Sequence, residues 1–323
     1  MKTSLLGETA SAGGLKVEGA AEPMRDLPAS VHAPVRTLGI GNTGAPFTRA
    51  AMHVFHTVVN GNLGCHDHTF MEIALVTSGQ GTHVSQSGTL PLATADVIVL
   101  RPGAWHAYVA CENLGVFNCC VSMQFLSRDL AFASEQAALN QLFWVRPLAG
   151  NNRGVFSLHL GEQEKASCEE QLRRVVACNG NKSDPCSFVE GVGHLLIALS
   201  IIGRQIELVD GEASAQAAHP AVLACRALIE DRCEYEWTLD ELAQKVHVAP
   251  EYLVRIFKRD SGISPIAFLM RCRAERAALL LLRSKKSIAE IGEEVGWSEP
   301  SYFARCFKKC YGMSASTYRE RFG

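Results

Sequence analysis

Apolar and polar positions follow a strand-like spacing over the first half of the chain. Residues 1–35 are rich in Ala, Gly, Ser and Glu and lack apolar periodicity, which predicts a flexible arm. From residue 36 onward, short apolar and β-branched runs alternate with glycine-rich breaks, a pattern typical of a β-sandwich or barrel. The expected strands are 52–59, 72–77, 82–87, 96–100, 116–125 and 154–160.

Helical periodicity replaces this spacing after residue 160. Two helices are expected at 162–178 and 188–209, separated by the turn-forming residues 179–185. The second helix carries an apolar stripe, which fits packing inside one subunit. The stripe consists of Leu195, Leu196, Leu199 and Ile202.

A change of composition marks a boundary between two domains. Residues 210–218 are small, polar and unpatterned, so we expect a linker there. It separates a first domain over residues 36–209 from a second over residues 219–323. The total of 323 residues agrees with this division, because one hydrophobic core rarely organises so long a chain.

The second domain contains an internal repeat. The segment Tyr252–Lys258 (YLVRIFK) returns fifty positions later as Tyr302–Lys308 (YFARCFK). A shorter amphipathic helix is expected before each copy, and each begins with a capping box, at Thr238 and at Ser287. The repeat therefore predicts two similar helix pairs.

Proline positions mark the remaining helix starts. Pro250 and Pro300 stand where the second helix of each pair begins, a position that tolerates the missing N–H. Ser264 and Pro265 begin a long helix that ends near Arg283 and joins the two pairs.

Each pair has the pattern of a helix-turn-helix unit, whose second helix enters the major groove of DNA. Arginine can bind guanine through two hydrogen bonds, while lysine neutralises phosphates. The alternative is a helical bundle with solvated basic faces, but the duplication favours DNA binding. The basic outer residues are Arg255, Lys258, Arg259, Arg305, Lys308 and Lys309.

These residues resemble the DNA-binding domain of the AraC/XylS family of bacterial transcriptional regulators. The resemblance runs from His219 to Phe322 and implies that two helix-turn-helix units bind DNA as one module. The chain departs from the family pattern at Ala249, Trp297 and Ala315. By position, the resemblance implies that the base-facing residues are Glu251, Val254, Arg255, Pro300, Ser301, Ala304 and Arg305.

The first domain contains a group of possible metal ligands. His66, His68 and Glu72 would share one face of an unbroken strand, and His106 would arrive from another strand. This pattern partly resembles the cupin barrel, which implies a divalent metal held by three histidines and one glutamate. The alternative is that these residues line a pocket or fill the core without a metal.

The first domain also carries aromatic and polar residues that suit a small-molecule pocket. Tryptophan and tyrosine can stack on a sugar ring, while arginine and histidine bind its hydroxyls. The alternative for Phe70 and Trp105 is filling of the barrel, and for Arg101 exposure on a loop. The candidate effector residues are His66, His68, Phe70, Glu72, Arg101, Trp105, His106 and Tyr108.

The resulting prediction is an α+β fold of two domains. An N-terminal cupin-like β-barrel carries a helical hairpin, and an all-α C-terminal domain has two helix-turn-helix units joined by a long helix. The layout is similar to that of sugar-responsive members of the family, especially rhamnose-type regulators.

Composition and charge narrow the class of protein. The net charge is −2, yet residues after 220 hold 17 Lys and Arg against 14 Asp and Glu, which fits a polyanionic partner. The apolar runs are too short for a membrane span, and Glu8 interrupts any signal-peptide core. The twelve cysteines include no CxxC pair, so we expect reduced thiols in the cytoplasm.

The leading hypothesis is a non-enzymatic transcription factor that binds promoter DNA and a small molecule, a sugar by resemblance. The resemblance also implies a homodimer with its contact on the helices at 162–178 and 188–209, and the apolar stripe fits this contact and core packing equally well. If the protein activates transcription, RNA polymerase is a further partner. A metal-dependent cupin enzyme with an appended DNA-binding domain is the alternative, and a constitutive DNA-binding protein is a third.

Overall fold

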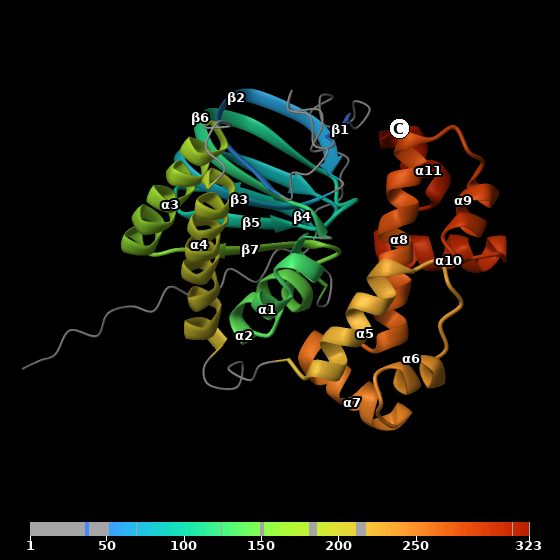
Figure 1. The fold of residues 1–323 in the computed structure, drawn as a ribbon. Coiled ribbons are helices and arrows are strands. Elements are labelled where there is room, and N and C mark those ends of the chain that lie inside the picture. Colours follow the sequence, from blue (N-terminus) through green and yellow to red (C-terminus); the bar gives the residue numbers. More distant parts are fainter. Residues whose placement is uncertain are drawn as a thin grey trace, which may run out of the picture.

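The computed structural model describes residues 36–38, 52–68, 70–123, 125–148, 152–180, 186–210, 218–311 and 313–322. A β domain comes first and a helical domain follows, which confirms the predicted fold class (Figure 1). The expected arm at 1–35 and most of the expected linker, residues 211–217, lie outside the described residues.

One sheet of seven strands forms the first domain. Its hydrogen-bonded order is β1-β2-β6-β3-β5-β7, and β4 pairs with β3. All pairs are antiparallel except β1 with β2. The strands are β1 (Arg36–Leu38), β2 (Met52–His68), β3 (Met71–Ser85), β4 (Gly88–Leu92), β5 (Asp96–Leu100), β6 (His106–Val121) and β7 (Val155–His159).

Three strands are longer than the sequence predicts. β3 runs through the glycine-rich stretch that was expected to divide it, because shifts of register against β6 absorb the irregular residues. Gly79 is needed there, since its φ is +72° and a Cβ atom would lie 2.2 Å from the carbonyl oxygen of Asn113. β2 and β6 also extend along each other beyond the expected ends.

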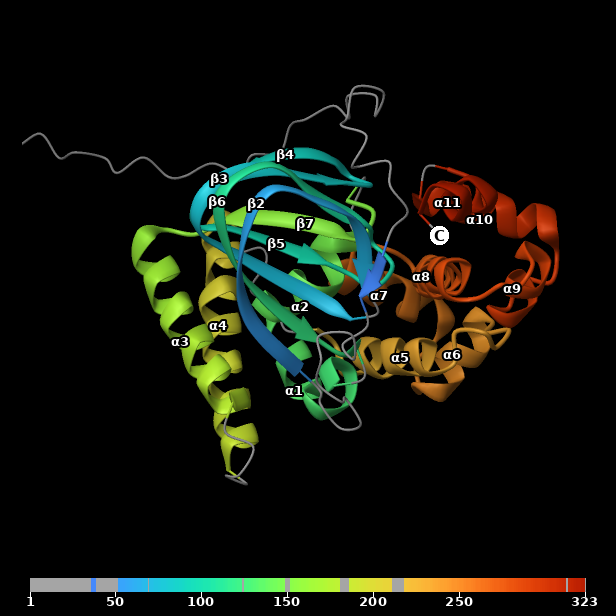
Figure 2. The same cartoon turned by 90° about the horizontal axis from the view of Figure 1, so that it is seen from above.

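A helical hairpin covers one side of the sheet, as predicted. It consists of α3 (Glu162–Gly180) and α4 (Ser187–Asp210), and the C-terminal domain lies on the opposite side of the sheet (Figures 1 and 2). Leu195, Leu199 and Ile202 are buried in the core of the same subunit, while Leu196 is partly buried. Packing inside the subunit therefore accounts for most of the apolar stripe.

Within the described residues, the Ser187–Ile206 part of α4 is long and apolar enough to cross a membrane. Almost half of this stretch is buried in the protein, and core helices of soluble proteins have the same composition.

A compact set of short helices between β6 and β7 was not predicted. It comprises two π-helices (Phe125–Asp129 and Gln141–Val145), α1 (Ala131–Ser134), α2 (Ala137–Asn140) and a 3-10 turn (Arg146–Leu148). Each is too short to show a helical period in the sequence. Phe143 and Trp144 are buried here, and the set packs against the C-terminal domain.

The C-terminal domain has the two predicted helix pairs and the joining helix. Both capping boxes are formed, at Thr238 and Ser287, and Pro250, Pro265 and Pro300 each occupy a helix start. The helices are α5 (Pro220–Asp231), α6 (Leu239–Lys245), α7 (Pro250–Ser261), α8 (Pro265–Arg283), α9 (Ile288–Glu294), α10 (Pro300–Tyr311) and α11 (Ala315–Phe322).

All twelve cysteines lie in the described part of the chain, and none of them forms a disulfide there.

Candidate DNA-binding surface and histidine cluster

The two recognition helices, α7 and α10, repeat one arrangement. Phe257 and Phe307 are fully buried on their inner faces, and Arg255 and Arg305 are exposed on their outer faces. Each arginine lies over the tyrosine three residues before it, with the guanidinium carbon 5.1 Å from the ring centre of Tyr252 or Tyr302. The internal repeat therefore extends to the side chains that would meet DNA.

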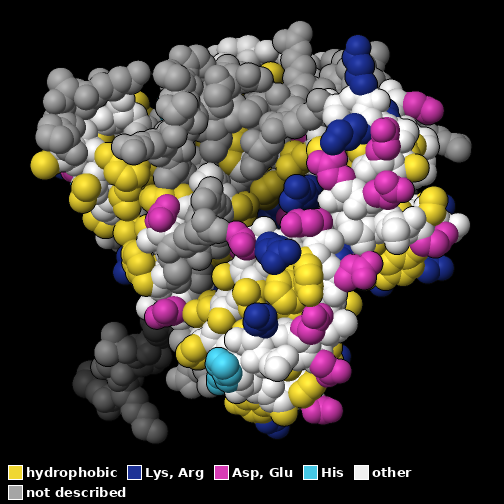
Figure 3. Space-filling model, turned by 45° about the vertical axis from the view of Figure 1, so that its right-hand side comes forward, with side chains coloured by type: hydrophobic (Ala, Val, Ile, Leu, Met, Phe, Trp, Pro, Cys, Tyr) yellow, Lys and Arg dark blue, Asp and Glu magenta, His cyan; other side chains and the backbone are white. Residues whose placement is uncertain are grey.

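Almost all the predicted DNA-binding residues are exposed. Val254 is half-buried, and Arg259 forms an ion pair with the neighbouring Asp260 at 2.5 Å. On the face shown in Figure 3, basic and acidic side chains are interspersed. The exposed residues are Glu251, Arg255, Lys258, Arg259, Pro300, Ser301, Ala304, Arg305, Lys308 and Lys309.

The two helix starts differ in capping. Ala249 has no side-chain oxygen to offer, so α7 begins without a side-chain cap. At α10 the carboxylate of Glu299 accepts hydrogen bonds from the backbone N–H groups of Ser301 and Tyr302, at 2.9 and 2.6 Å. The second unit therefore has a firmer helix start than the first.

The predicted metal ligands converge inside the β domain. Nε2 of His68 lies 2.9 Å from Nε2 of His106 and 2.5 Å from Oε2 of Glu72. Nε2 of His106 and Oε2 of Glu72 are 3.9 Å apart. A ligand atom of His66 also lies within 4.8 Å of those of His68 and His106. All four side chains are buried.

These residues do not lie on one unbroken strand. His66 and His68 lie at the end of β2, but β3 begins only at Met71, so Glu72 reaches the cluster from a different strand. The condition that the strand is unbroken is therefore not met. His106 stands at the start of β6, and this confirms its arrival from another strand.

His83 is a further member of the cluster that the sequence analysis missed. Its Nε2 lies 3.1 Å from Nδ1 of His106, and its side chain is buried on β3. A lone histidine in a strand pattern gives no signal of such a contact. Nδ1 of His66 donates to the carbonyl oxygen of Gly64 at 2.9 Å, so Nε2 of His66 keeps its lone pair for a ligand.

Burial disfavours the protonated form of His66, His83 and His106. It lowers the pKa of His66 and of His83 to about 4 and holds the pKa of His106 well below its usual value. Burial by itself would raise the pKa of Glu72, but its interactions with His68, His66 and His83 together outweigh burial and lower that pKa. His66, His83 and His106 therefore offer neutral nitrogens beside an ionised carboxylate.

Two family models match the chain, one over the helix-turn-helix units and one over the β domain that holds the histidine cluster. The model of a helix-turn-helix domain matches residues 242–321, and that of an AraC-like ligand-binding domain matches residues 62–144. The chain belongs to the AraC family of transcriptional regulators. As such it binds promoter DNA and is not an enzyme, which confirms both predictions and sets aside the cupin-enzyme alternative.

Named relatives of this AraC-family regulator include other transcriptional regulators. The activator RhaS of Citrobacter koseri is 27% identical over 257 residues, which cover 79% of this chain and 87% of that protein. The arabinose operon regulatory protein of Escherichia coli is 31% identical over 135 residues, covering 40% and 46%. Among solved structures, the C-terminal domain of AraT, a response regulator from Geobacillus stearothermophilus, is 38% identical over 32% of this chain and 86% of that chain, with a TM-score of 0.31.

The other predicted effector residues divide between two places in the regulator. The rings of Phe70 and Tyr108 lie 4.7 Å from His68 and 5.4 Å from His106, respectively, so both belong to the cluster. Trp105 is fully buried and packs with the core of the second helix-turn-helix unit. Arg101 is also buried, not exposed on a loop, and its guanidinium is directed at Glu275 of the C-terminal domain.

The donor set of the cluster suits a divalent metal. His66, His68 and His106 would supply imidazole nitrogens and Glu72 a carboxylate oxygen, which are ligands for zinc, iron, manganese or nickel. His83 would orient His106 through its other ring nitrogen. Metal binding by these residues is a proposal that the chemistry and convergence of the side chains support.

Metal binding can be measured by titrating the purified, chelator-treated protein with Co²⁺ or Zn²⁺ in a calorimeter. We expect one ion per chain, with binding abolished in His68→Ala and His106→Ala. Loss of the orienting contact in His83→Phe should weaken affinity by about 10- to 100-fold. His159→Ala is the control, because that histidine is exposed and pairs with Asp96. A wild-type protein that binds neither ion would contradict the metal proposal.

Proposed function

We propose that this regulator is a homodimer whose β domain binds a small polar effector, a sugar, at the histidine cluster. The unsatisfied polar atoms of the cluster carry this proposal. Nδ1 of His68 and the hydroxyl of Tyr108 are buried, and no group in the described part of the chain hydrogen-bonds to them. A buried polar atom without a partner costs about 1–3 kcal/mol, so hydroxyl groups of a ligand would stabilise this site.

Other features support the choice of a sugar. The rings of Phe70 and Tyr108 lie beside the polar atoms, and such a mixture suits the apolar faces and hydroxyls of a sugar. The arabinose operon regulatory protein is among the relatives. For the homodimer, support comes from α4, where Val189 and Ile197 are exposed on the hairpin.

The effector can be sought by thermal unfolding of the protein in a panel of monosaccharides. We expect one sugar to raise the melting temperature, with no rise in Tyr108→Phe, because that variant lacks the unsatisfied hydroxyl. Tyr235→Phe is the matched control, since Tyr235 is exposed in the other domain. If no sugar stabilises the wild-type protein, the sugar part of the proposal is wrong.

A further inference from the structure

A buried ion pair joins the two domains. Arg101 Nε donates to Glu275 Oε1 at 2.9 Å, and its Nη2 donates to Oε2 at 3.2 Å. Its Nη1 donates to the carbonyl oxygen of Phe143 at 3.0 Å. The side chains of Arg101 and Glu275 are only 2% and 15% exposed, so each charge depends on the other for compensation.

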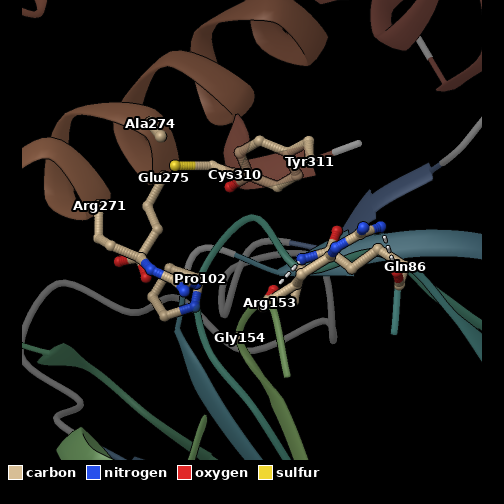
Figure 4. A pocket seen from close by; sticks show the side chains of 10 residues that line it. Gln86, Pro102, Arg153, Gly154, Arg271, Ala274, Glu275, Cys310 and Tyr311 are labelled. Atoms are coloured by element: carbon tan, nitrogen blue, oxygen red, sulfur yellow. Dashed lines mark hydrogen bonds between the residues drawn. The ribbon is translucent and has the colours of Figure 1, made fainter. Parts of the chain in front are cut away.

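The residues that follow Arg101 touch the helices of the DNA-binding domain. Tyr318 on α11 donates its hydroxyl to the carbonyl oxygen of Gly103 at 3.0 Å. Gly103 has a φ of +76°, and a Cβ atom there would lie 3.1 Å from the Tyr311 hydroxyl and 3.2 Å from the backbone oxygen of Glu275. Figure 4 shows the narrow crevice beside this contact, with Pro102 facing Arg271 and Glu275 of α8. This close fit leaves little room for the β domain and the DNA-binding domain to move independently at this contact.

The same short segment reaches the histidine cluster at its other end. The backbone N–H of Gly103 donates to the carbonyl oxygen of His68 at 2.8 Å. The side chain of Trp105 packs with the core of the second helix-turn-helix unit, and His106 follows directly as a cluster member. Residues 101–106 therefore contact both the cluster and the DNA-binding domain.

The β domain also contacts the first unit. Asn140 Nδ2 donates to the carbonyl oxygen of Asp260 at the end of α7, at 2.7 Å, and Asn140 Oδ1 accepts from Arg226 on α5 at 2.5 Å. Both helix-turn-helix units and the joining helix thus contact the β domain. Arg255 and Arg305 remain exposed in this arrangement, so docking leaves the DNA-facing side chains accessible.

We propose that Arg101 is a positioning residue whose ion pair with Glu275 docks segment 101–106 on α8. This docking couples the histidine cluster to the relative placement of the two helix-turn-helix units. Docking restricts how the two units move against each other, which favours simultaneous contact with two grooves. A ligand that shifts His68 or His106 shifts a segment whose other end is held by α8 and α11. This inference rests on the proposed function, since it concerns regulation through the same site.

The test measures affinity for a duplex selected from a random pool and for a shortened duplex with only one groove contact. We expect Arg101→Met and Glu275→Gln each to weaken binding to the full duplex about tenfold and to leave the short duplex unaffected. The double variant should be no weaker than either single variant, because both remove one interaction. Arg101→Lys keeps the charge but loses the paired contact, so it should lie between wild type and Arg101→Met.

Glu234→Gln is the matched control. Glu234 forms an ion pair with Arg276, which lies on α8 like Glu275. This pair is exposed and lies within the DNA-binding domain. Its loss should leave both affinities unchanged.

A second readout requires neither DNA nor effector. In ¹⁵N spectra of the histidine side chains, Glu275→Gln should shift the signals of His68 and His106 and leave the exposed His159 unchanged. Unshifted cluster signals, or equal losses on both duplexes, would overturn the coupling. If the wild-type protein responds to no sugar while the histidine signals shift, the sugar proposal fails and the coupling stands.

Discussion

Replacing Arg255 or Arg305 with alanine is expected to weaken binding to a selected duplex by about 1–3 kcal/mol each, which is about 5- to 150-fold. Both guanidinium groups are exposed and are held over a tyrosine ring by the same three-residue spacing. A side chain restrained in this way loses less freedom when it binds a base. Each variant should also accept any base at one position of the DNA site that its own helix-turn-helix unit contacts. Sequencing of reselected duplexes would reveal this change.

Lys308→Ala serves as the comparison for these arginine variants. Lys308 is exposed on the same helix as Arg305, and a phosphate contact carries no sequence information. The variant should weaken all duplexes alike and reduce the dependence of log affinity on log salt concentration by about one unit. If both arginine variants bound like wild type, these arginines would not read bases.

Replacing Phe307 with alanine is expected to destabilise the DNA-binding domain by about 3–5 kcal/mol. This ring is fully buried in the second unit, where it stacks on Tyr311 at 4.7 Å and meets the edge of Tyr318 at 5.4 Å. Because these rings hold α10 against α11, the recognition helix should lose its position together with the core. Denaturant unfolding followed by circular dichroism would measure the loss.

Two further variants show whether the loss comes from this core. Phe257→Ala removes the equivalent ring of the first unit and should cost a similar amount, since Phe257 is also fully buried, against Phe268. Phe132→Ala should change stability by less than about 0.5 kcal/mol, because Phe132 is half exposed in the other domain. Wild-type stability in Phe307→Ala would show that the ring lies outside the core.

The sequence was most informative where local rules and the repeat agree. Capping boxes at Thr238 and Ser287 and prolines at helix starts act over three or four residues, so they could be read without knowledge of the fold. The repeat then placed Arg255 and Arg305 at equivalent positions of the two units, and both are exposed as expected. The starts of α6, α7, α8, α9 and α10 accordingly agree with the prediction, whereas α5 and α11 were not predicted.

Strand limits were less predictable because pairing partners determine them. β3 continues through Gly79, where the sequence suggested a break, since register shifts against β6 accommodate the extra residues. β2 ends at His68 and β3 begins at Met71, so the expected gap between strands 52–59 and 72–77 is much shorter than predicted. His66, His68, Glu72 and His106 nevertheless meet, but as ends of three strands.

Contacts between the domains left no signal in the sequence. Arg101 and Glu275 are 174 positions apart, and neither lies in a motif that would connect them. Arg101 was therefore predicted to be an effector residue, whereas in the structure its charge is directed at the other domain. His83 was missed for the same reason, since its partner His106 lies on a neighbouring strand.

Hydroxyl-radical footprinting on a selected duplex tests most directly whether the two helix-turn-helix units bind DNA together. We expect two protected regions on one face of the duplex, separated by one helical turn of about 10.5 base pairs. Arg255→Ala should weaken protection of one region and Arg305→Ala that of the other. A single protected region, affected by only one of the two variants, would contradict the account.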